Sequence, residues 1–139
     1  MTVILTTAVR TFLDERRFAT LATIAADGTP QLTVMWYLRR GDTIVFNTEA
    51  GRQKERNLRR DQRIALCVED GYRYVSVNGI VEVIDGQAIS HADIRELTAR
   101  YADPGTEDAF YDRNFRGCRR VSYVLHVDRL RSSGLEPTP

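Results

Sequence analysis

Short turns that contain glycine separate runs of strand-forming residues along the first half of the sequence. These turns lie at residues 26–30, 39–42 and 70–71, and each contains an Asp-Gly or Gly-Asp pair. Both residue types supply the backbone freedom that a tight connection between antiparallel strands needs. Because the flanking runs are rich in β-branched and aromatic residues, the pattern predicts a succession of β-hairpins.

Six strands are predicted in total. They cover residues 18–24, 31–38, 43–47, 64–68, 72–84 and 121–128. Gly79 interrupts the long fifth strand, which indicates a β-bulge or the close approach of another backbone. The last strand has the clearest alternation, because Val121, Tyr123, Leu125 and Val127 fall on one face.

Three helices are predicted beside these strands. The first begins near Thr7, a candidate N-cap residue. A short basic helix lies between residues 52 and 63. The third covers about residues 90–101, where Ser90 and Asp93 resemble a capping box.

Two segments carry weaker signals. Residues 102–120 hold three aromatic side chains as well as proline and glycine, so we expect an irregular or partly helical excursion. The tail at residues 132–139 is expected to be loose.

Together these elements predict one domain, residues 1–139, of the mainly β class with peripheral helices. Strands joined mostly by hairpins favour a six-stranded antiparallel split β-barrel with helices at its rims. A parallel sheet is not expected, since the strands do not alternate with long helices. The sequence also contains neither a GxGxxG nor a GxxxxGK[ST] loop.

Composition excludes several classes of protein. No apolar run approaches the roughly 20 residues that span a bilayer, and the N-terminus lacks the apolar stretch of a secretory signal. We therefore expect a cytoplasmic protein that does not bind membranes. Cys67 and Cys118 are expected to be reduced, and they form no metal-ligand pattern with His91 and His126.

The basic helix stands out in a chain whose net charge is only +1. Residues 52–63 hold six cationic side chains against two acidic ones. A local positive field in a nearly neutral protein favours a small anionic ligand over a nucleic acid, which needs a broad basic face. Thr48 and the amides of residues 49–52 are expected at the start of the helix, where backbone N–H groups favour an anion. The alternative is a solvated helix face.

Three motifs in a fixed order carry a resemblance to a known family. They are the first hairpin ATIAADGTPQ, the second hairpin WYLRRGDTIVFNT and the basic segment GRQKERNLRRDQR. In this order they resemble the pyridoxamine 5′-phosphate oxidase-like split β-barrel proteins. The similarity is closer to the actinobacterial branch of flavin- and deazaflavin-dependent oxidoreductases, and it covers residues 7–85 best.

The resemblance implies a homodimer with two cofactor clefts between the protomers. The cofactor ring would pack on the second strand, and the cofactor phosphate would bind at the basic helix. The ring would be lined by Thr33, Val34, Met35 and Trp36. The phosphate would be held by Asn47, Thr48, Arg52, Gln53 and Lys54. For Trp36, packing in the core is the alternative interpretation.

The resemblance also implies a function. The RNLRRD sequence is typical of the branch that uses coenzyme F420, which predicts an F420-dependent reductase that transfers a hydride to a small electrophilic organic substrate. Because the cofactor performs such chemistry, no catalytic side chain is expected. Vitamer oxidation is not expected, since Gln53-Lys54 replaces the usual Arg-Lys pair and the C-terminal SSGLEPTP lacks the arginines of those oxidases.

Other readings stay open. An FMN-binding protein of the oxidase type is the first, and a non-enzymatic carrier or sensor of flavin or haem is the second. A barrel that binds single-stranded nucleic acid is disfavoured by the net charge and by the concentration of cations in one helix.

Overall fold

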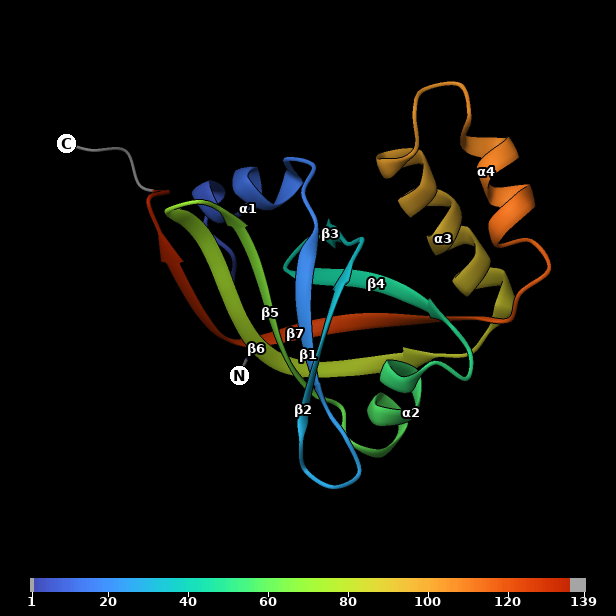
Figure 1. Cartoon of the computed structure of the whole chain (residues 1–139). Coiled ribbons are helices and arrows are strands. Elements are labelled where there is room, and N and C mark those ends of the chain that lie inside the picture. Colours follow the sequence, from blue (N-terminus) through green and yellow to red (C-terminus); the bar gives the residue numbers. More distant parts are fainter. Residues whose placement is uncertain (1, 136–139) are drawn as a thin grey trace.

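A computed structural model describes residues 2–135 of the chain as one curled antiparallel sheet with helices at its margins (Figure 1). The strands are β1 (Ala19–Ile24), β2 (Pro30–Met35), β3 (Leu38–Arg40), β4 (Thr43–Glu49), β5 (Arg63–Asp70), β6 (Arg73–Ile84) and β7 (Arg120–Ser133). The helices are α1 (Thr7–Asp14), α2 (Gln53–Arg60), α3 (Gln87–Tyr101) and α4 (Glu107–Asn114).

The sheet has the order β2-β1-β5-β6-β7-β4-β3, and every neighbouring pair is antiparallel. It bends so strongly that β1 and β2 cross over β4 and β7 (Figure 1). The prediction of a mainly β antiparallel fold with peripheral helices is confirmed. The predicted count of six strands is wrong, because the sheet has seven strands, and it does not close.

The additional strand arises where the predicted strand 31–38 divides. Tyr37 turns into the core and donates a hydrogen bond from its hydroxyl to the Leu13 carbonyl, at 2.7 Å. Its backbone N–H donates to the hydroxyl of Tyr101, at 3.2 Å, instead of to a neighbouring strand. The chain therefore leaves β1 after Met35 and joins β4 at Leu38.

The main core lies inside the curled sheet. It is built from α1 and from the inward-facing residues of the strands, with Tyr37, Phe46 and Tyr123 among its largest fully buried side chains. At Gly79 the pairing of β6 with β7 shifts register. A Cβ atom at this position would lie 2.1 Å from the His126 carbonyl oxygen, so the predicted bulge and close backbone approach are both confirmed.

Helix boundaries differ from expectation in three places. The N-cap of α1 is Thr6, whose hydroxyl accepts a hydrogen bond from Val9 N–H, and not Thr7. The predicted capping box is wrong, because α3 begins at Gln87 and Ser90 lies inside it. The excursion 102–120 contains α4, which packs against α3 to form a helical hairpin beside β4 and β7.

The last strand is longer than predicted. β7 continues to Ser133, where Ser132 and Ser133 pair with Val75 and Tyr74. These two residues had been assigned to the loose tail, so the prediction was wrong for them. Residues 136–139 of that tail lie outside the described residues.

Candidate functional site

A cavity of about 380 Å³ lies between the sheet, the first turn of α2 and the α3–α4 hairpin. From the strands and their ends it is lined by Phe18, Val34, Met35, Trp36, Asn47 and Arg120. From the helices and their ends it is lined by Lys54, Ile94, Leu97, Phe110, Asn114 and Phe115. Its volume falls in the range of small-molecule binding sites in proteins.

One end of the cavity is cationic. Lys54, in the first turn of α2, is partly buried, and Arg120, at the start of β7, is only 7% exposed. Within residues 2–135, no carboxylate oxygen lies within 4.0 Å of a nitrogen of either side chain. Burial is the main cause that lowers the pKa of both groups below their ordinary values, and nearby cations add to it. At Arg120 the neighbouring Cys118 and Glu49 act in the opposite direction, but burial outweighs them.

Asn47 fixes the position of Arg120. Its Nδ2 donates to the Ser90 carbonyl and to Ser122 Oγ, each at 2.9 Å. Its Oδ1 therefore faces the other way and accepts from Arg120 Nε at 2.8 Å. Both ends of this buried amide are therefore used within the chain.

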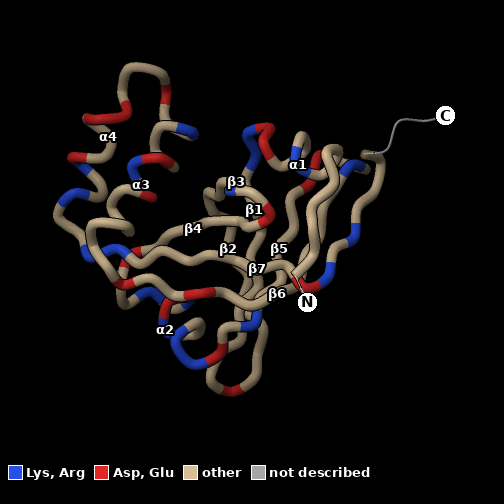
Figure 2. The backbone as a smooth tube through the Cα atoms, turned by 180° about the vertical axis from the view of Figure 1, so that it is seen from behind, with Lys and Arg blue, Asp and Glu red and all other residues tan. Residues whose placement is uncertain are grey.

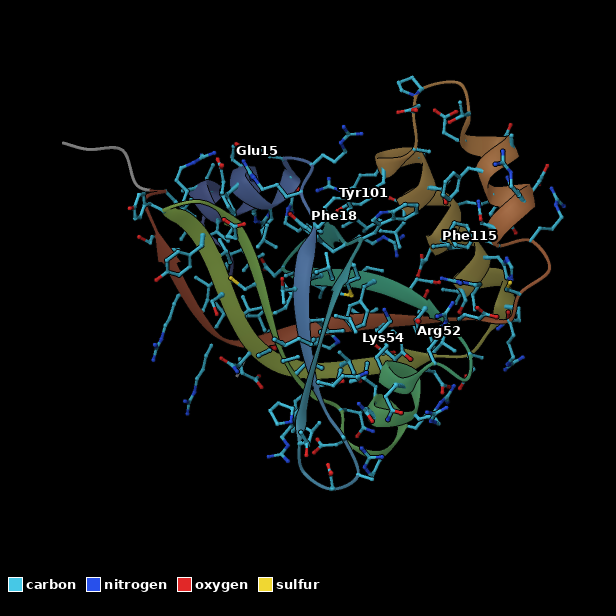
Figure 3. The ribbon with its side chains drawn as sticks, in the orientation of Figure 1. Glu15, Phe18, Arg52, Lys54, Tyr101 and Phe115 are labelled. Carbon is cyan, nitrogen blue, oxygen red and sulfur yellow. The ribbon has the colours of Figure 1, made fainter. Side chains whose placement is uncertain are left out.

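The other end of the cavity is aromatic. Trp36 stacks on Tyr101 with ring centroids 5.1 Å apart, and Tyr101 stacks in turn on Phe18 at 5.7 Å. Phe110 and Phe115, from α4 and its C-terminal end, contact Trp36 at 5.8 and 6.1 Å. Figure 3 shows Phe18 and Tyr101 close together, with Phe115 on the side of the helical hairpin and Lys54 beside α2.

The helical hairpin is held in place by His91. Its Nδ1 atom lies 2.7 Å from the Tyr111 hydroxyl, and its Nε2 atom lies 3.0 Å from the Cys118 carbonyl oxygen. A carbonyl only accepts, so Nε2 carries the proton and Nδ1 accepts from Tyr111. This residue therefore joins α3 to α4 and to the segment that leads into Arg120.

The structure brings five of the predicted site residues together at this cavity. They are Val34, Met35, Trp36, Asn47 and Lys54.

The other four predicted residues do not line it. Thr33 shares a face of β2 with Met35 but lies outside the lining, and its buried hydroxyl makes no hydrogen bond with the described residues. Thr48 is buried in β4. Arg52 is exposed and lies 3.5 Å from Glu49, while Gln53 donates to Asn57 Oδ1 at 2.8 Å.

Most cations of the basic helix have partners within the chain. Arg59 pairs with Glu55 at 2.8 Å and with Asp85. Arg60 donates to the Ile24 carbonyl at 2.6 Å, and Arg56 donates to the Gly51 carbonyl at 2.7 Å. These three side chains fasten α2 to its surroundings, which leaves Lys54 as the cation that α2 contributes to the cavity lining.

The anion site predicted at Thr48 and the amides of residues 49–52 does not coincide with the start of the helix. Thr48 and Glu49 belong to β4, and α2 begins only at Gln53. The N–H groups of Ala50 and Arg52 are already bonded to the carbonyls of Arg119 and Glu49. They are therefore not free to bind a ligand.

Sequence reasoning missed part of the lining. Arg120 is the most important omission, since nothing in the pair Arg119-Arg120 distinguishes the buried side chain from the exposed one. The basic residues at the start of β7 and those of α2 lie on the same side of the molecule (Figure 2). Only the tertiary structure reveals this proximity.

Other chemistry has little support among residues 2–135. No group of three His, Cys, Asp or Glu side chains there is placed to hold a metal ion. Both cysteines are free thiols. None of the described helices is long and apolar enough to cross a membrane.

The curled sheet and its lateral cavity define a split-barrel protein of a known type. A model of the family named Pyridoxamine 5′-phosphate oxidase matches residues 5–129, and the chain belongs to this family. The comparison with curated proteins gave no match.

Solved structures agree with this assignment. A conserved hypothetical protein from Mycobacterium tuberculosis is 30% identical, with a TM-score of 0.79 over 97% of this chain and 88% of that chain. An F420 reductase is 28% identical, with a TM-score of 0.70 over 88% of this chain and 94% of the other. HupZ from Group A Streptococcus, 16% identical with a TM-score of 0.69 over 97% of this chain and 100% of its own, shares the fold.

Proposed function

We propose that this protein is an oxidoreductase that binds coenzyme F420 and passes a hydride to a small electrophilic organic substrate. FMN is the alternative cofactor. The observation that carries the proposal is the pair of cations Lys54, which is partly buried, and Arg120, which is buried. Neither forms an ion pair within 4.0 Å among the described residues, and both line one cavity beside aromatic side chains.

The residues present fit an anionic, ring-bearing cofactor. An uncompensated buried charge is costly, so a cavity that keeps two of them is suited to an anion. Lys54 would hold the cofactor phosphate near the first turn of α2, where the helix dipole adds to the attraction. Val34, Met35 and Trp36 offer a largely apolar surface for the ring.

The bound cofactor would supply the hydride chemistry. The chain's own contribution is binding, orientation and exclusion of water. The aromatic side chains around Trp36 cover one side of the cavity, and Asn47 keeps Arg120 in place. Among the described residues, the lining contains no carboxylate and no imidazole.

Support for F420 over FMN comes from the similar F420 reductase and from the RNLRRD segment. The basic helix supports F420 less strongly than its sequence suggested. Three of its arginines, Arg56, Arg59 and Arg60, are bonded within the chain.

Titration of the apo-protein with each cofactor tests the assignment. Trp36 is the chain's single tryptophan and lines the cavity, so its fluorescence reports on this site alone. We expect both ligands to quench it, with F420 the tighter. Tighter binding of FMN would overturn the deazaflavin assignment, and binding of neither would overturn the proposed function. Oxidation of the bound reduced cofactor by an added electrophile separates an enzyme from a carrier or sensor.

We also propose that the protein forms a homodimer in the cytoplasm. None of the helices within residues 2–135 lies over the outward face of β2, β1, β5 and β6 (Figure 1). On that face Leu32 and Val34 are 69% and 68% exposed, and small residues occupy its centre. Large exposed apolar side chains on the face of a sheet favour burial against a second copy.

A further inference from the structure

Arg120 lies where the cationic end of the cavity meets the aromatic end. Its guanidinium carbon lies 4.7 Å from the centroid of the Phe115 ring. Phe115 in turn contacts Trp36 and Phe110. The Arg120 side chain thus faces the α3–α4 hairpin, whereas Lys54 comes from α2 on the side labelled in Figure 3.

Within the part of the chain that the structure describes, the terminal nitrogens of the Arg120 guanidinium are free to donate hydrogen bonds to a ligand. Nε is occupied by Asn47 Oδ1 at 2.8 Å, and the two terminal nitrogens make no hydrogen bond with residues 2–135. Terminal nitrogens that lie in one plane match the two oxygens of a carboxylate. The residue as a whole is only 7% exposed, and its terminal nitrogens are not among the fully buried unpaired atoms, so a ligand can reach them from the cavity that Arg120 lines.

Lys54 and Arg120 belong to different elements, α2 and β7. Burial lowers the pKa of Lys54, and the charges of Arg52 and Arg120 add to this effect. An anion bound on the α2 side compensates Lys54 first and leaves the guanidinium over Phe115 facing the remaining space. That space is bordered by Trp36, Phe110 and Phe115.

We propose that Arg120 binds an oxyanion of the substrate, while the rings of Trp36, Phe110 and Phe115 bind its flat skeleton. The substrate class is then a planar aromatic or conjugated molecule with a carboxylate or a similar oxyanion. Aromatic side chains favour flat partners through stacking, and the uncompensated guanidinium excludes cations. This molecule is a substrate only if the proposed function holds, whereas the binding subsite stands on the geometry alone.

Calorimetric titration of the apo-protein with three small probes tests the subsite. The probes are 2-naphthoate, 2-naphthylmethylammonium and decalin-2-carboxylate. We expect 2-naphthoate to bind at least about tenfold more tightly than either of the others, because only it is both flat and anionic. Equal binding of the naphthyl cation would overturn the role of Arg120, and equal binding of the decalin acid would overturn the role of the rings.

Matched variants locate the binding. Arg120→Met is expected to weaken 2-naphthoate by about tenfold or more, and Arg119→Met, its exposed neighbour, is expected to leave the affinity unchanged. Arg120→Lys keeps the positive charge but lacks the two planar donors of a guanidinium, so we expect it to bind 2-naphthoate with intermediate affinity. This conservative variant also shows whether loss of binding in Arg120→Met comes from a folding defect. Lys54→Met should weaken the cofactor much more than 2-naphthoate.

The two proposals fail in different ways. Loss of cofactor binding in Arg120→Met with unchanged 2-naphthoate affinity would assign Arg120 to the cofactor and overturn the subsite. Binding of 2-naphthoate that depends on Arg120, in a protein that binds neither F420 nor FMN, would support the subsite and overturn the proposed function.

Discussion

At the scale of single residues, the cations of the candidate site differ from many other cations of the protein, because they lack a paired carboxylate among the described residues. Arg59 and Arg63 each have a carboxylate partner at 2.8 Å. The Arg63–Asp61 pair is partly exposed and contributes little to stability. Lys54 and Arg120 have no such partner among the described residues, and they lie where a ligand would supply one.

Lys54→Met is therefore expected to weaken binding of the anionic cofactor by about 1–3 kcal/mol, the usual effect of removing a partly desolvated charged partner. Arg60→Met is the matched control, because Arg60 is exposed and bonds to the Ile24 carbonyl outside the cavity lining. Fluorescence titration of both variants measures the difference. Equal losses in the two variants would show that α2 attracts the ligand only through its overall charge.

The same residue predicts a dependence of stability on pH. Burial and the cations Arg52 and Arg120 lower the pKa of Lys54 below its ordinary value of 10.5. Between the folded and unfolded values the unfolded chain binds more protons, so the stability of the ligand-free protein rises with pH across that window. Below the window the charged Lys54 costs stability, and Lys54→Met should be the more stable protein.

Urea denaturation of both proteins in phosphate-free buffer, from neutral pH toward pH 10.5, measures this effect. We expect the advantage of Lys54→Met to shrink as the pH rises. Titration of Tyr37 and Tyr123 is common to both proteins and cancels in the difference. A constant advantage would mean that Lys54 keeps an ordinary pKa in the folded chain.

The residues of the candidate site could be predicted from the sequence only where a local motif fixes their position. Val34, Met35 and Trp36 follow the first hairpin, and Lys54 follows the break after β4, so their positions depend on nearby residues. Arg120 depends on Asn47, Ser90 and Ser122, which come from three separate elements. A contact network of that kind has no signature along the chain.

At the scale of elements, Gly79 allows the close approach of the β6 and β7 backbones at the bulge. β6 pairs with β5 and β7 along its length, and the register with β7 shifts at this residue. The backbone of β7 approaches so closely that a side chain at position 79 would overlap it.

Gly79→Ala should therefore destabilise the fold by about 1–3 kcal/mol or more, as expected when a methyl group is forced into a packed site. Gly117→Ala is the matched control, because nothing lies within 4 Å of a Cβ atom there and its backbone is not left-handed. Chemical denaturation of both variants gives the comparison. A Gly79→Ala protein as stable as the control would mean that β7 moves aside at little cost.

Turn chemistry predicted most strands correctly, but it did not reveal the break at Trp36-Tyr37. No glycine or proline marks this point. The chain changes direction there because Tyr37 is drawn into the core and Tyr101 bonds to its backbone, and both partners are distant in sequence. The partly helical character of residues 102–120 agrees with α4, but the sequence did not predict where this helix begins and ends.

At the scale of the whole molecule, the outward face of the sheet is the feature that a single chain leaves unexplained. Pairing across the strands places Leu32, Ala22, Ala65 and Asn78 in one row, and the neighbouring row contains Val34 and Cys67. The middle of both rows consists of small side chains. A second copy can approach such a surface closely.

Ala65→Glu places a carboxylate at the centre of this face and is expected to convert the dimer into a monomer. Ala109→Glu, on exposed α4, is the matched control that adds the same charge away from the face. Light scattering at micromolar concentration should give about twice 15.9 kDa for the unmodified protein and the control, and a single chain for Ala65→Glu. Because Val34 belongs both to this face and to the cavity lining, loss of the dimer should also weaken cofactor binding. A monomeric unmodified protein that binds its cofactor with full affinity would remove the second protomer from the site.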